Sequence, residues 1–432
     1  MNVYNLKVVY TILNSVYRDC KFSNIALNSV LKSDNNCDTA SVTHMVYGVL
    51  RYDVQLQYLI DTLTTKSPKP NLLVLLKMGL FALRYTNTPQ YATINNCVNL
   101  ARLIHKGGVN NFVNAILRKS CEVQLPALDT SVHSLSINYS YPEWVVQLIM
   151  TDYGIDTATQ FLGYVPTYKT HIRHNPTTTT RDELYRNLVR YGEVHKSSLG
   201  LYVEAKHLNN CDKSLYAIQS LASMMIVNAL GQDLSCNVLD LCAAPGGKSV
   251  YFVHNSPNSN IVACDIHAHK LPLISNYAKS MGVSQQVQVL LNDATVYNPD
   301  FESRFDIVLC DVPCSGLGMV YSKHEIVLTT TMQDIQQLTI IQSKILSNAA
   351  RYVRSGGRIL YSTCTITIAE NESVVRQFLK THSDFETVVV DNQYVHSDDE
   401  GYIRLWPHLH GTDGFFAAVL TKKYEQKTIA RL

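Results

Sequence analysis

From about residue 215 onward, short apolar runs alternate with helical stretches, and this alternation constrains the fold more than any other feature of the sequence. The apolar runs are Val238–Leu241, Ile261–Cys264, Val287–Leu291, Phe305–Cys310 and Ile359–Tyr361. Each run ends in a short polar or glycine-bearing turn, as strands commonly do. The alternation predicts an α/β domain with a mostly parallel sheet and helices on both faces. Ligands bind such sheets beyond the carboxyl ends of the strands, so these turns are where chemistry is expected.

The part of the chain before this pattern predicts two further regions. Residues 1–125 have helical patterns, and the stretch Leu72–Leu83 is too densely apolar for a surface helix, which predicts a buried one. Residues 126–215 have a mixed pattern that predicts a small α+β module. The elements expected in it are strands at 171–174 and 200–205 and a helix at 181–191. The catalytic domain is then expected over residues 216–432.

Composition excludes several classes of protein. Hydrophobic residues make up 46% and charged residues 17% of the 432 residues, which excludes wholesale disorder. No run of 18 apolar residues predicts a membrane-spanning helix, and the first residues lack the layout of a signal peptide. Eleven scattered cysteines do not resemble a disulfide framework, so a reducing cytoplasmic location is expected.

Charge is distributed unevenly along the chain. Residues 1–150 carry 13 Lys and Arg against 8 Asp and Glu, whereas the rest carries 24 against 27. The positive balance of the first part suggests an anionic partner, although an unevenly charged solvated surface fits it equally well.

The first run, Val238–Leu241, leads into a glycine-bearing turn and then a helix. The turn consists of Cys242, Ala243, Ala244, Pro245, Gly246, Gly247 and Lys248. Glycines at such a turn let backbone N–H groups approach a ligand closely. The turn is not a phosphate-binding Walker loop, because Cys242 stands where that loop needs a glycine, and an ordinary structural turn is the alternative.

Aspartates follow three of the predicted strands. Asp265 comes about twenty residues after the glycine turn, where nucleotide-binding sheets place an acid that meets ribose hydroxyls. Asp293 and Asp311 follow the next two strands. Any one of them alone is commonly a strand-end cap. The three together predict a shared ligand with hydroxyl and amino donors.

Two cysteines stand at the same predicted edge. Cys314 lies in a Pro-Cys turn and Cys364 in a Thr-Cys turn, each after a predicted strand. A free cysteine is usually a small buried hydrophobe, but one at a strand end near helix N-termini can be a thiolate nucleophile. The cysteine and histidine spacings do not resemble a zinc site, so no metal site is predicted.

Taken together, these motifs resemble the RNA cytosine-5 methyltransferases that use S-adenosyl-L-methionine, and among them the Sun/RsmB type, which methylates bacterial 16S ribosomal RNA. The matching catalytic pieces are Asp240–Lys248, Asp311–Gly316, Tyr361–Thr365, Glu370–Glu372 and His410–Phe416. The matching N-terminal pieces are Tyr47–Arg51, Thr88–Ala92 and Asn111–Arg118. The resemblance implies an all-α NusB-like RNA-binding domain, a small RNA-binding or linker module and a Rossmann-like methyltransferase domain.

The resemblance also implies roles for the site residues. The turn from Cys242 to Lys248 would pack on the methionine moiety of the cofactor, while Asp265 would bind its ribose and Asp293 its adenine. Cys364 would add to carbon 6 of cytosine, which activates carbon 5 for methyl transfer. Asp311 would border the cofactor and hold the base edge, and Cys314 would assist release of the adduct.

Several alternatives stay open. The same chemistry on transfer RNA fits the catalytic motifs, and a non-catalytic RNA-binding assembly factor would keep the same fold. DNA methyltransferases use the Pro-Cys cysteine as nucleophile, so the roles of Cys314 and Cys364 can be argued in reverse. The family's two arginines after Gly318 are absent here, although Lys323 remains, and Gln219–Ser223 lacks the family's acid. The expected partner is 16S ribosomal RNA or a small-subunit assembly intermediate. The protein is expected to act as a monomer and not to bind a membrane.

Overall fold

The computed structural model describes four stretches of the chain, residues 1–32, 36–105, 108–166 and 169–424. They divide into two units that are described separately here. The helical unit comprises residues 1–164 and 320–330, and the sheet unit comprises residues 165–319 and 331–432. No helix among the described residues is long and apolar enough to cross a membrane.

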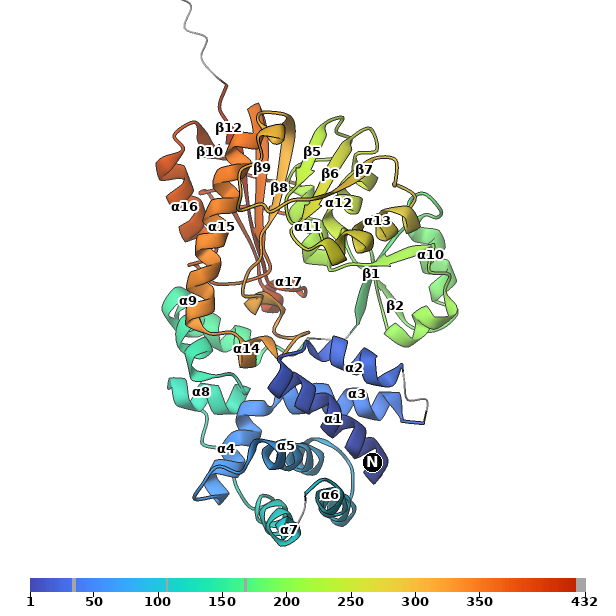
Figure 1. The fold of residues 1–432 in the computed structure, drawn as a ribbon, viewed down its shortest axis with the longest axis vertical. Coiled ribbons are helices and arrows are strands. Elements are labelled where there is room, and N and C mark those ends of the chain that lie inside the picture. Colours follow the sequence, from blue (N-terminus) through green and yellow to red (C-terminus); the bar gives the residue numbers. More distant parts are fainter. Residues whose placement is uncertain (33–35, 106–107, 167–168, 425–432) are drawn as a thin grey trace, which may run out of the picture. The chain divides into compact units, whose positions relative to one another are not determined.

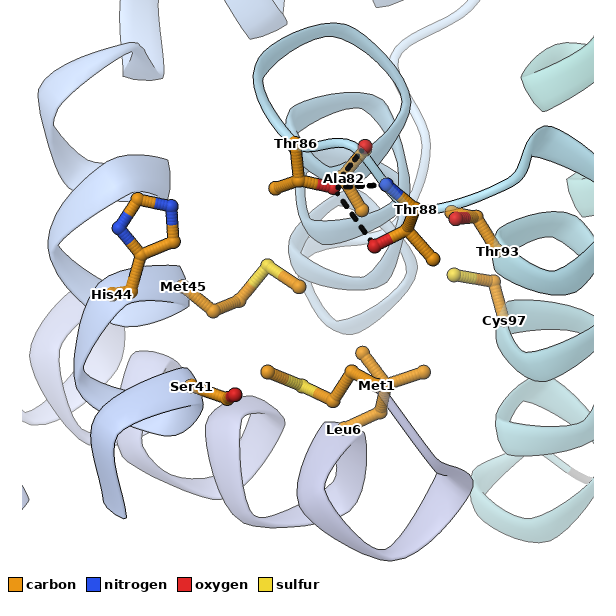
Figure 2. A pocket seen from close by; sticks show the side chains of 10 residues that line it. All are labelled: Met1, Leu6, Ser41, His44, Met45, Ala82, Thr86, Thr88, Thr93 and Cys97. Atoms are coloured by element: carbon orange, nitrogen blue, oxygen red, sulfur yellow. Dashed lines mark hydrogen bonds between the residues drawn. The ribbon is translucent and has the colours of Figure 1, made fainter. Parts of the chain in front are cut away.

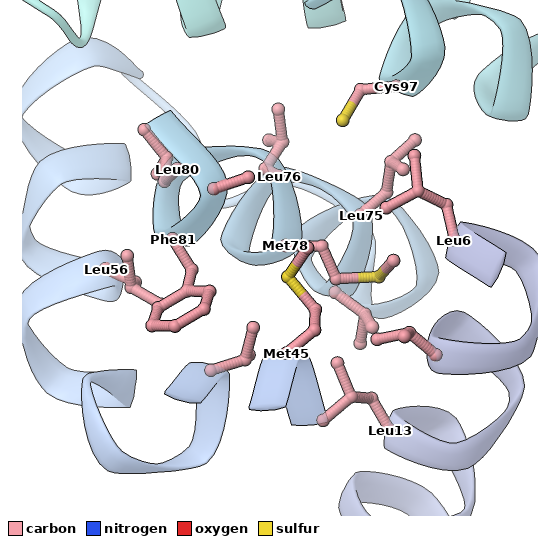
Figure 3. Packing of buried hydrophobic residues seen from close by; sticks show 14 of the residues in the cluster. Leu6, Leu13, Met45, Leu56, Leu75, Leu76, Met78, Leu80, Phe81 and Cys97 are labelled. Atoms are coloured by element: carbon pink, nitrogen blue, oxygen red, sulfur yellow. The ribbon is translucent and has the colours of Figure 1, made fainter. Parts of the chain in front are cut away.

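The helical unit is built from helices throughout its described part (Figure 1). These are α1 (Val3–Asp19), α2 (Ser23–Leu31), α3 (Thr39–Arg51), α4 (Asp53–Leu63), α5 (Pro70–Tyr85), α6 (Gln90–Ile104), α7 (Val109–Lys119), α8 (Val132–Tyr139), α9 (Glu143–Gly163) and α14 (Ile326–Thr329). Helix α5 is buried over most of its length, which confirms the prediction for Leu72–Leu83. Figure 3 shows Leu75, Met78 and Phe81 of α5 among side chains from the surrounding helices.

A buried ion pair interrupts this apolar core. Lys77 Nζ on α5 lies 2.6 Å from Asp53 Oδ1 at the start of α4, and both side chains are buried. The Tyr17 hydroxyl donates to the same carboxylate oxygen. A buried lysine needs such a partner, because an isolated charge in an apolar interior is very costly.

A small cavity of about 150 Å³ lies between α1, α3, α5 and α6 (Figure 2). Met1, Met45 and Cys97 line it together with several threonines. The Thr93 hydroxyl on its wall is buried and has no hydrogen-bond partner among the described residues. The cavity is well below the roughly 300 Å³ of a small ligand site, so it offers no room for a nucleotide.

The segment 320–330 follows the loop that carries Cys314 but packs within the helical unit. Glu325 Oε1 accepts hydrogen bonds from the Ser23 backbone N–H at 2.9 Å and the Ser23 hydroxyl at 2.8 Å. The Tyr321 hydroxyl donates to the Phe161 carbonyl. Sequence periodicity carries no signal for this placement, because the contacts span up to 302 residues.

The sheet unit begins with a small antiparallel sheet. Its strands, in the order β2-β3-β1-β4, are β2 (Val194–Lys196), β3 (Leu201–Val203), β1 (Thr170–His174) and β4 (Tyr216–Ile218). Helix α10 (Arg181–Leu188) begins with a capping box, in which Thr180 and Glu183 satisfy each other's backbone N–H groups. The strands and the helix agree with the elements expected between 171 and 205. The expected start of the module at 126 differs from the structure, because residues 132–163 form α8 and α9 of the helical unit.

The larger sheet has eight strands, of which seven follow the order β10-β12-β9-β8-β5-β6-β7 and β11 pairs with β12. They are β5 (Asn237–Asp240), β6 (Asn260–Asp265), β7 (Val287–Leu291), β8 (Phe305–Asp311), β9 (Val353–Thr363), β10 (Phe385–Thr387), β11 (Tyr402–Leu405) and β12 (Phe415–Lys422). Strands β5 to β9 pair in parallel, while β10, β11 and β12 pair antiparallel. The sheet is therefore mostly parallel, as predicted, with an antiparallel edge that the sequence pattern does not reveal.

Helices cover both faces of this sheet (Figure 1). They are α11 (Leu221–Asn228), α12 (Gly247–Asn255), α13 (Leu271–Ser280), α15 (Met332–Tyr352) and α16 (Glu372–Thr381), with the short α17 (Pro407–His410) near β12. Successive residues of β5 enter different cores: Val238 packs with α11, α12 and α13, whereas Leu239 packs with α15 and α16. Burial on both faces explains why β5, β6 and β8 are largely continuous apolar runs, whereas the edge strand β7 is mostly exposed. The chain order reverses between β5 and β8, which marks a topological switch point.

Candidate active site

The glycine turn connects β5 to α12 at the switch point. Asp240, the last residue of β5, accepts hydrogen bonds from the Ser249 hydroxyl at 2.5 Å and the Cys242 N–H at 3.3 Å. Burial raises the pKa of Asp240 to about 7. The Ala243 N–H donates to the Cys264 carbonyl of β6 at 2.7 Å. The turn is thus tied to both neighbouring elements and keeps a fixed shape.

Two glycines of this turn have different reasons to be glycine. Gly246 has φ 108°, a backbone conformation that other residues rarely adopt. Gly247 begins α12, and a Cβ there would meet nothing nearer than the Gln219 amide at 3.7 Å. Neither the backbone conformation nor the neighbouring side chains require a glycine at 247. The absence of a side chain there leaves open space against the turn.

The structure brings the sequence-predicted aspartates to this edge of the sheet. Asp265 ends β6, is buried, and accepts a hydrogen bond from the His267 N–H at 2.9 Å. Asp293 follows β7 and accepts from the Thr295 N–H at 2.9 Å and its hydroxyl at 2.7 Å. These are strand-end turns, and they fix the carboxylates in place.

Asp311 ends β8 and forms an ion pair with Lys248. Lys248 Nζ lies 2.6 Å from Asp311 Oδ2, and the Ser362 hydroxyl donates to Oδ1 at 3.0 Å. The Asp311 side chain is 30% exposed, so its carboxylate still has lone pairs open to a ligand. Lysine 248 therefore links the glycine turn to the end of β8.

The sulfurs of Cys314 and Cys364 lie 3.4 Å apart. Strands β8 and β9 are parallel neighbours that align Asp311 with Ser362, and the two cysteines follow in the next turns. Both side chains are half-buried and neither forms a disulfide. Either sulfur can donate a hydrogen bond to the other. The pair is therefore positioned to share a proton.

The pKa of Cys314 is well above its usual value because its thiol is hydrogen-bonded to Cys364, and burial and the negative charge of Glu370 add to the effect. Burial also raises the pKa of Cys242 and Cys310, and that of Cys264 to about 12. These four thiols keep their protons at neutral pH, so they are poor nucleophiles.

Glu370 anchors the loop that carries Cys314, a role that the sequence analysis did not identify. One carboxylate oxygen accepts from the Ser315 N–H at 2.8 Å and from Gln342 Nε2 at 3.1 Å. The other accepts from the Ser315 hydroxyl at 2.6 Å and the Thr367 hydroxyl at 2.8 Å. Gln342 Nε2 also donates to the Pro313 carbonyl at 2.9 Å, so both sides of Cys314 are held. Glu370 stood in a matching motif, but Gln342 had no sequence signal.

The motif His410–Phe416 closes onto this loop through the backbone. The Gly414 N–H donates to the Gly318 carbonyl at 2.8 Å, and the Gly318 N–H donates to the Cys364 carbonyl at 3.0 Å. A Cβ at Gly318 would lie 2.0 Å from the Gly414 carbonyl oxygen. Glycine at 318 is therefore needed for the close approach of three segments around the cysteine pair.

Known proteins resemble this chain over nearly its whole length. Residues 226–421 match the family described as 16S rRNA methyltransferase RsmB/F, and residues 6–122 match the NusB family. A probable ribosomal RNA small subunit methyltransferase B from Bacillus subtilis (strain 168) is 32% identical, covering 93% of this chain and 95% of the relative. The ribosomal RNA small subunit methyltransferase B of Photorhabdus laumondii subsp. laumondii is 28% identical over 98% of this chain and 100% of its own.

Solved structures agree with the fold. The crystal structure of PH0851 has a TM-score of 0.83 and 25% identity, covering 98% of this chain and 99% of that one. NSun6 from Pyrococcus horikoshii with SFG shares the fold at a TM-score of 0.57 and 20% identity, covering 66% of this chain and 99% of its own. The chain therefore belongs to the ribosomal RNA small subunit methyltransferase B family, with a NusB-like helical region and a Rossmann-like methyltransferase sheet.

Proposed function

We propose that this protein methylates carbon 5 of a cytosine in 16S ribosomal RNA, with S-adenosyl-L-methionine as methyl donor and Cys364 as covalent nucleophile. The observation that carries the proposal is the 3.4 Å pair of sulfurs at the sheet edge that also holds Asp311 and the glycine turn. Relatives that span the whole chain are named as ribosomal RNA small subunit methyltransferases, which supports ribosomal RNA as the substrate.

The residues at the strand ends fit this cofactor. The open space at Gly247 accommodates a ligand lying against the turn, and no other feature explains a glycine there. The Asp265 carboxylate suits ribose hydroxyls, and Asp293 suits the adenine amino group. NSun6, which has the same fold, was solved with SFG. When bound, the cofactor supplies an electrophilic methyl group.

The protein's own groups would act on the cytosine. Carbon 5 of cytosine is a weak nucleophile, so the Cys364 thiolate first adds to carbon 6, and the new carbon–sulfur bond makes carbon 5 enamine-like. Asp311 holds the base edge through its exposed carboxylate. Transfer of the methyl group to carbon 5 would leave the donor as the neutral thioether. Loss of the carbon 5 proton to solvent then reforms the 5,6 double bond, which breaks the carbon–sulfur bond and releases Cys364 as a thiolate.

The assignment of Cys364 as the nucleophile follows the family resemblance, and the raised pKa of Cys314 supports it. Because the pKa of Cys314 is raised, that thiol keeps its proton and donates it toward the Cys364 sulfur. Such a donor stabilises the Cys364 thiolate before attack and again when it departs. The Glu370 network fixes the Cys314 loop, which keeps this donor in place. Cys314 therefore assists release.

Methyl transfer from tritiated S-adenosyl-L-methionine tests the proposal. Unmodified 16S ribosomal RNA and transfer RNA are offered separately, and the labelled base is identified after nuclease digestion. We expect label on cytosine carbon 5 of 16S ribosomal RNA, none with Cys364→Ser, and full activity for the matched half-buried control Cys236→Ser. Label on transfer RNA alone would show that the target is wrong. RNA binding without transfer to either RNA would favour a non-catalytic assembly factor.

A further inference from the structure

A polar pocket of about 480 Å³ lies in the sheet unit, and neither Cys314 nor Cys364 lines it. It is bordered by β1, the start of α10 and the end of α12. The residues that give it its chemistry are Arg173, His174, Arg181, Tyr251, His254 and Asn255. No acidic residue stands among the described residues that line it. The pocket is thus large enough for a nucleotide and cationic.

Arg173 is the unusual member of this set, because its side chain is buried and its partners are neutral. It is 2% exposed, and its Nε donates to Gln219 Oε1 at 2.8 Å. Its Nη1 donates to His254 Nδ1 at 2.8 Å, while His254 Nε2 contacts the Met281 carbonyl at 3.0 Å. Its Nη2 donates to the Tyr277 hydroxyl at 3.4 Å, and its guanidinium lies over the Tyr251 ring. None of the ion pairs among the described residues includes Arg173. A buried cation with neutral partners is costly unless an anion completes it.

The pKa values of the two neighbouring histidines are lowered, in part by the positive charge of the arginines. Burial and then the charge of Arg173 lower the pKa of His254 to about 4. Burial, Arg173 and Arg181 lower the pKa of His174, whose buried Nδ1 has no hydrogen-bond partner among the described residues. Both rings are therefore neutral at pH 7 and can serve as hydrogen-bond partners. Arg181 is half-buried, and its Nη1 donates hydrogen bonds to the carbonyls of Ser197 and Ser198.

We propose that this pocket binds a backbone phosphate of the substrate RNA, held by the half-buried Arg181, with the buried Arg173 contributing its positive charge from beneath. Arginine side chains suit phosphate oxygens. The site rests on the proposed RNA substrate but is separate from the catalytic pair. His254 lies seven residues after Gly247 on α12, about 10 Å along that helix. Gln219 bridges the two places, because its Nε2 also donates to the Gly247 carbonyl at 3.2 Å.

Binding of a fluorescent single-stranded 16S RNA fragment to the full chain, measured by anisotropy at several salt concentrations, tests this site. Arg181→Gln is expected to weaken binding about tenfold. It should also reduce the slope of log affinity against log salt by about 0.7, the share of one single-strand phosphate. Arg186→Gln makes the same charge change on the exposed side of α10 and should alter neither quantity. An unchanged slope in Arg181→Gln would overturn the proposal.

Two further experiments distinguish failure of this site from failure of the proposed function. Inorganic phosphate and the RNA fragment are compared as stabilisers in thermal melts of wild type and Arg181→Gln. If phosphate stabilises wild type alone while RNA affinity is equal in both proteins, the pocket serves a free anion and the RNA assignment is wrong. Methyl transfer at saturating RNA is measured separately. A wild type that transfers no methyl group refutes the proposed function, whereas equal RNA binding by both proteins refutes this site.

Discussion

Removing the Glu370 side chain should destabilise the loop that carries Cys314, and the structure sets the size of the effect. In Glu370→Ala, the Ser315 N–H and the Gln342 amide lose their shared acceptor, while the two hydroxyls of the network can rotate to other partners. Each stranded buried N–H costs about 1–3 kcal/mol, so the sheet unit should lose about 2–6 kcal/mol of stability. Glu370→Gln keeps one acceptor oxygen and should cost only about 1–2 kcal/mol.

The chain's two tryptophans make this measurable, because Trp144 lies in the helical unit and Trp406 in the sheet unit. Urea unfolding of a Trp144→Phe parent then follows the sheet unit through Trp406 fluorescence. Methyl transfer should fall on the order of 100-fold in Glu370→Ala, because a loosened loop misplaces Cys314. A stability for Glu370→Ala within about 0.5 kcal/mol of the parent would refute the anchoring role.

Other substitutions test separate parts of the structure. Gly318→Ala places a Cβ 2.0 Å from a carbonyl oxygen and should lower the melting temperature sharply, whereas Gly247→Ala should melt normally but bind S-adenosyl-L-methionine more weakly by calorimetry. Lys77→Met leaves the buried Asp53 carboxylate without its cation, although the Tyr17 hydroxyl still donates to it, and should cost about 3–5 kcal/mol in urea unfolding, most of it recovered by adding Asp53→Asn. The raised pKa of Asp240 means that the folded chain holds a proton which the unfolded chain has lost, so stability falls as pH rises from 3.8 to about 7. Asp240→Asn should remove that fall, and urea titrations at pH 5 and 7.5 check it.

Local sequence patterns predicted which segments form helices and strands, but they did not predict which segments pack against one another. The apolar run Val287–Leu291 coincides with β7, and Leu72–Leu83 lies within the buried α5. Both predictions rest on short-range periodicity. The antiparallel edge formed by β12 and the packing of 320–330 in the helical unit depend on contacts between segments far apart in the chain. Composition and period carry no information about such partners.

The candidate site shows the same division. Strand ends predicted where Asp265, Asp311 and the two cysteines would gather, because parallel strands bring their carboxyl ends to one edge. The 3.4 Å separation of the sulfurs depends on the register of β8 against β9, which the sequence does not state. Glu370 was visible as part of a motif, but its role depends on Gln342 from the distant α15. The roles of these residues stay predictions until the cysteine variants are tested.

The most direct test of the account is to look for the covalent protein–RNA adduct itself. Wild type, Cys364→Ser and Cys314→Ser are incubated with 16S ribosomal RNA and S-adenosyl-L-methionine and then run on a denaturing gel. Cys314→Ser should accumulate a denaturant-resistant complex, because the departing Cys364 thiolate loses its donor, and Cys364→Ser should form none. A complex that accumulates in Cys364→Ser and is absent from Cys314→Ser would contradict the assigned roles.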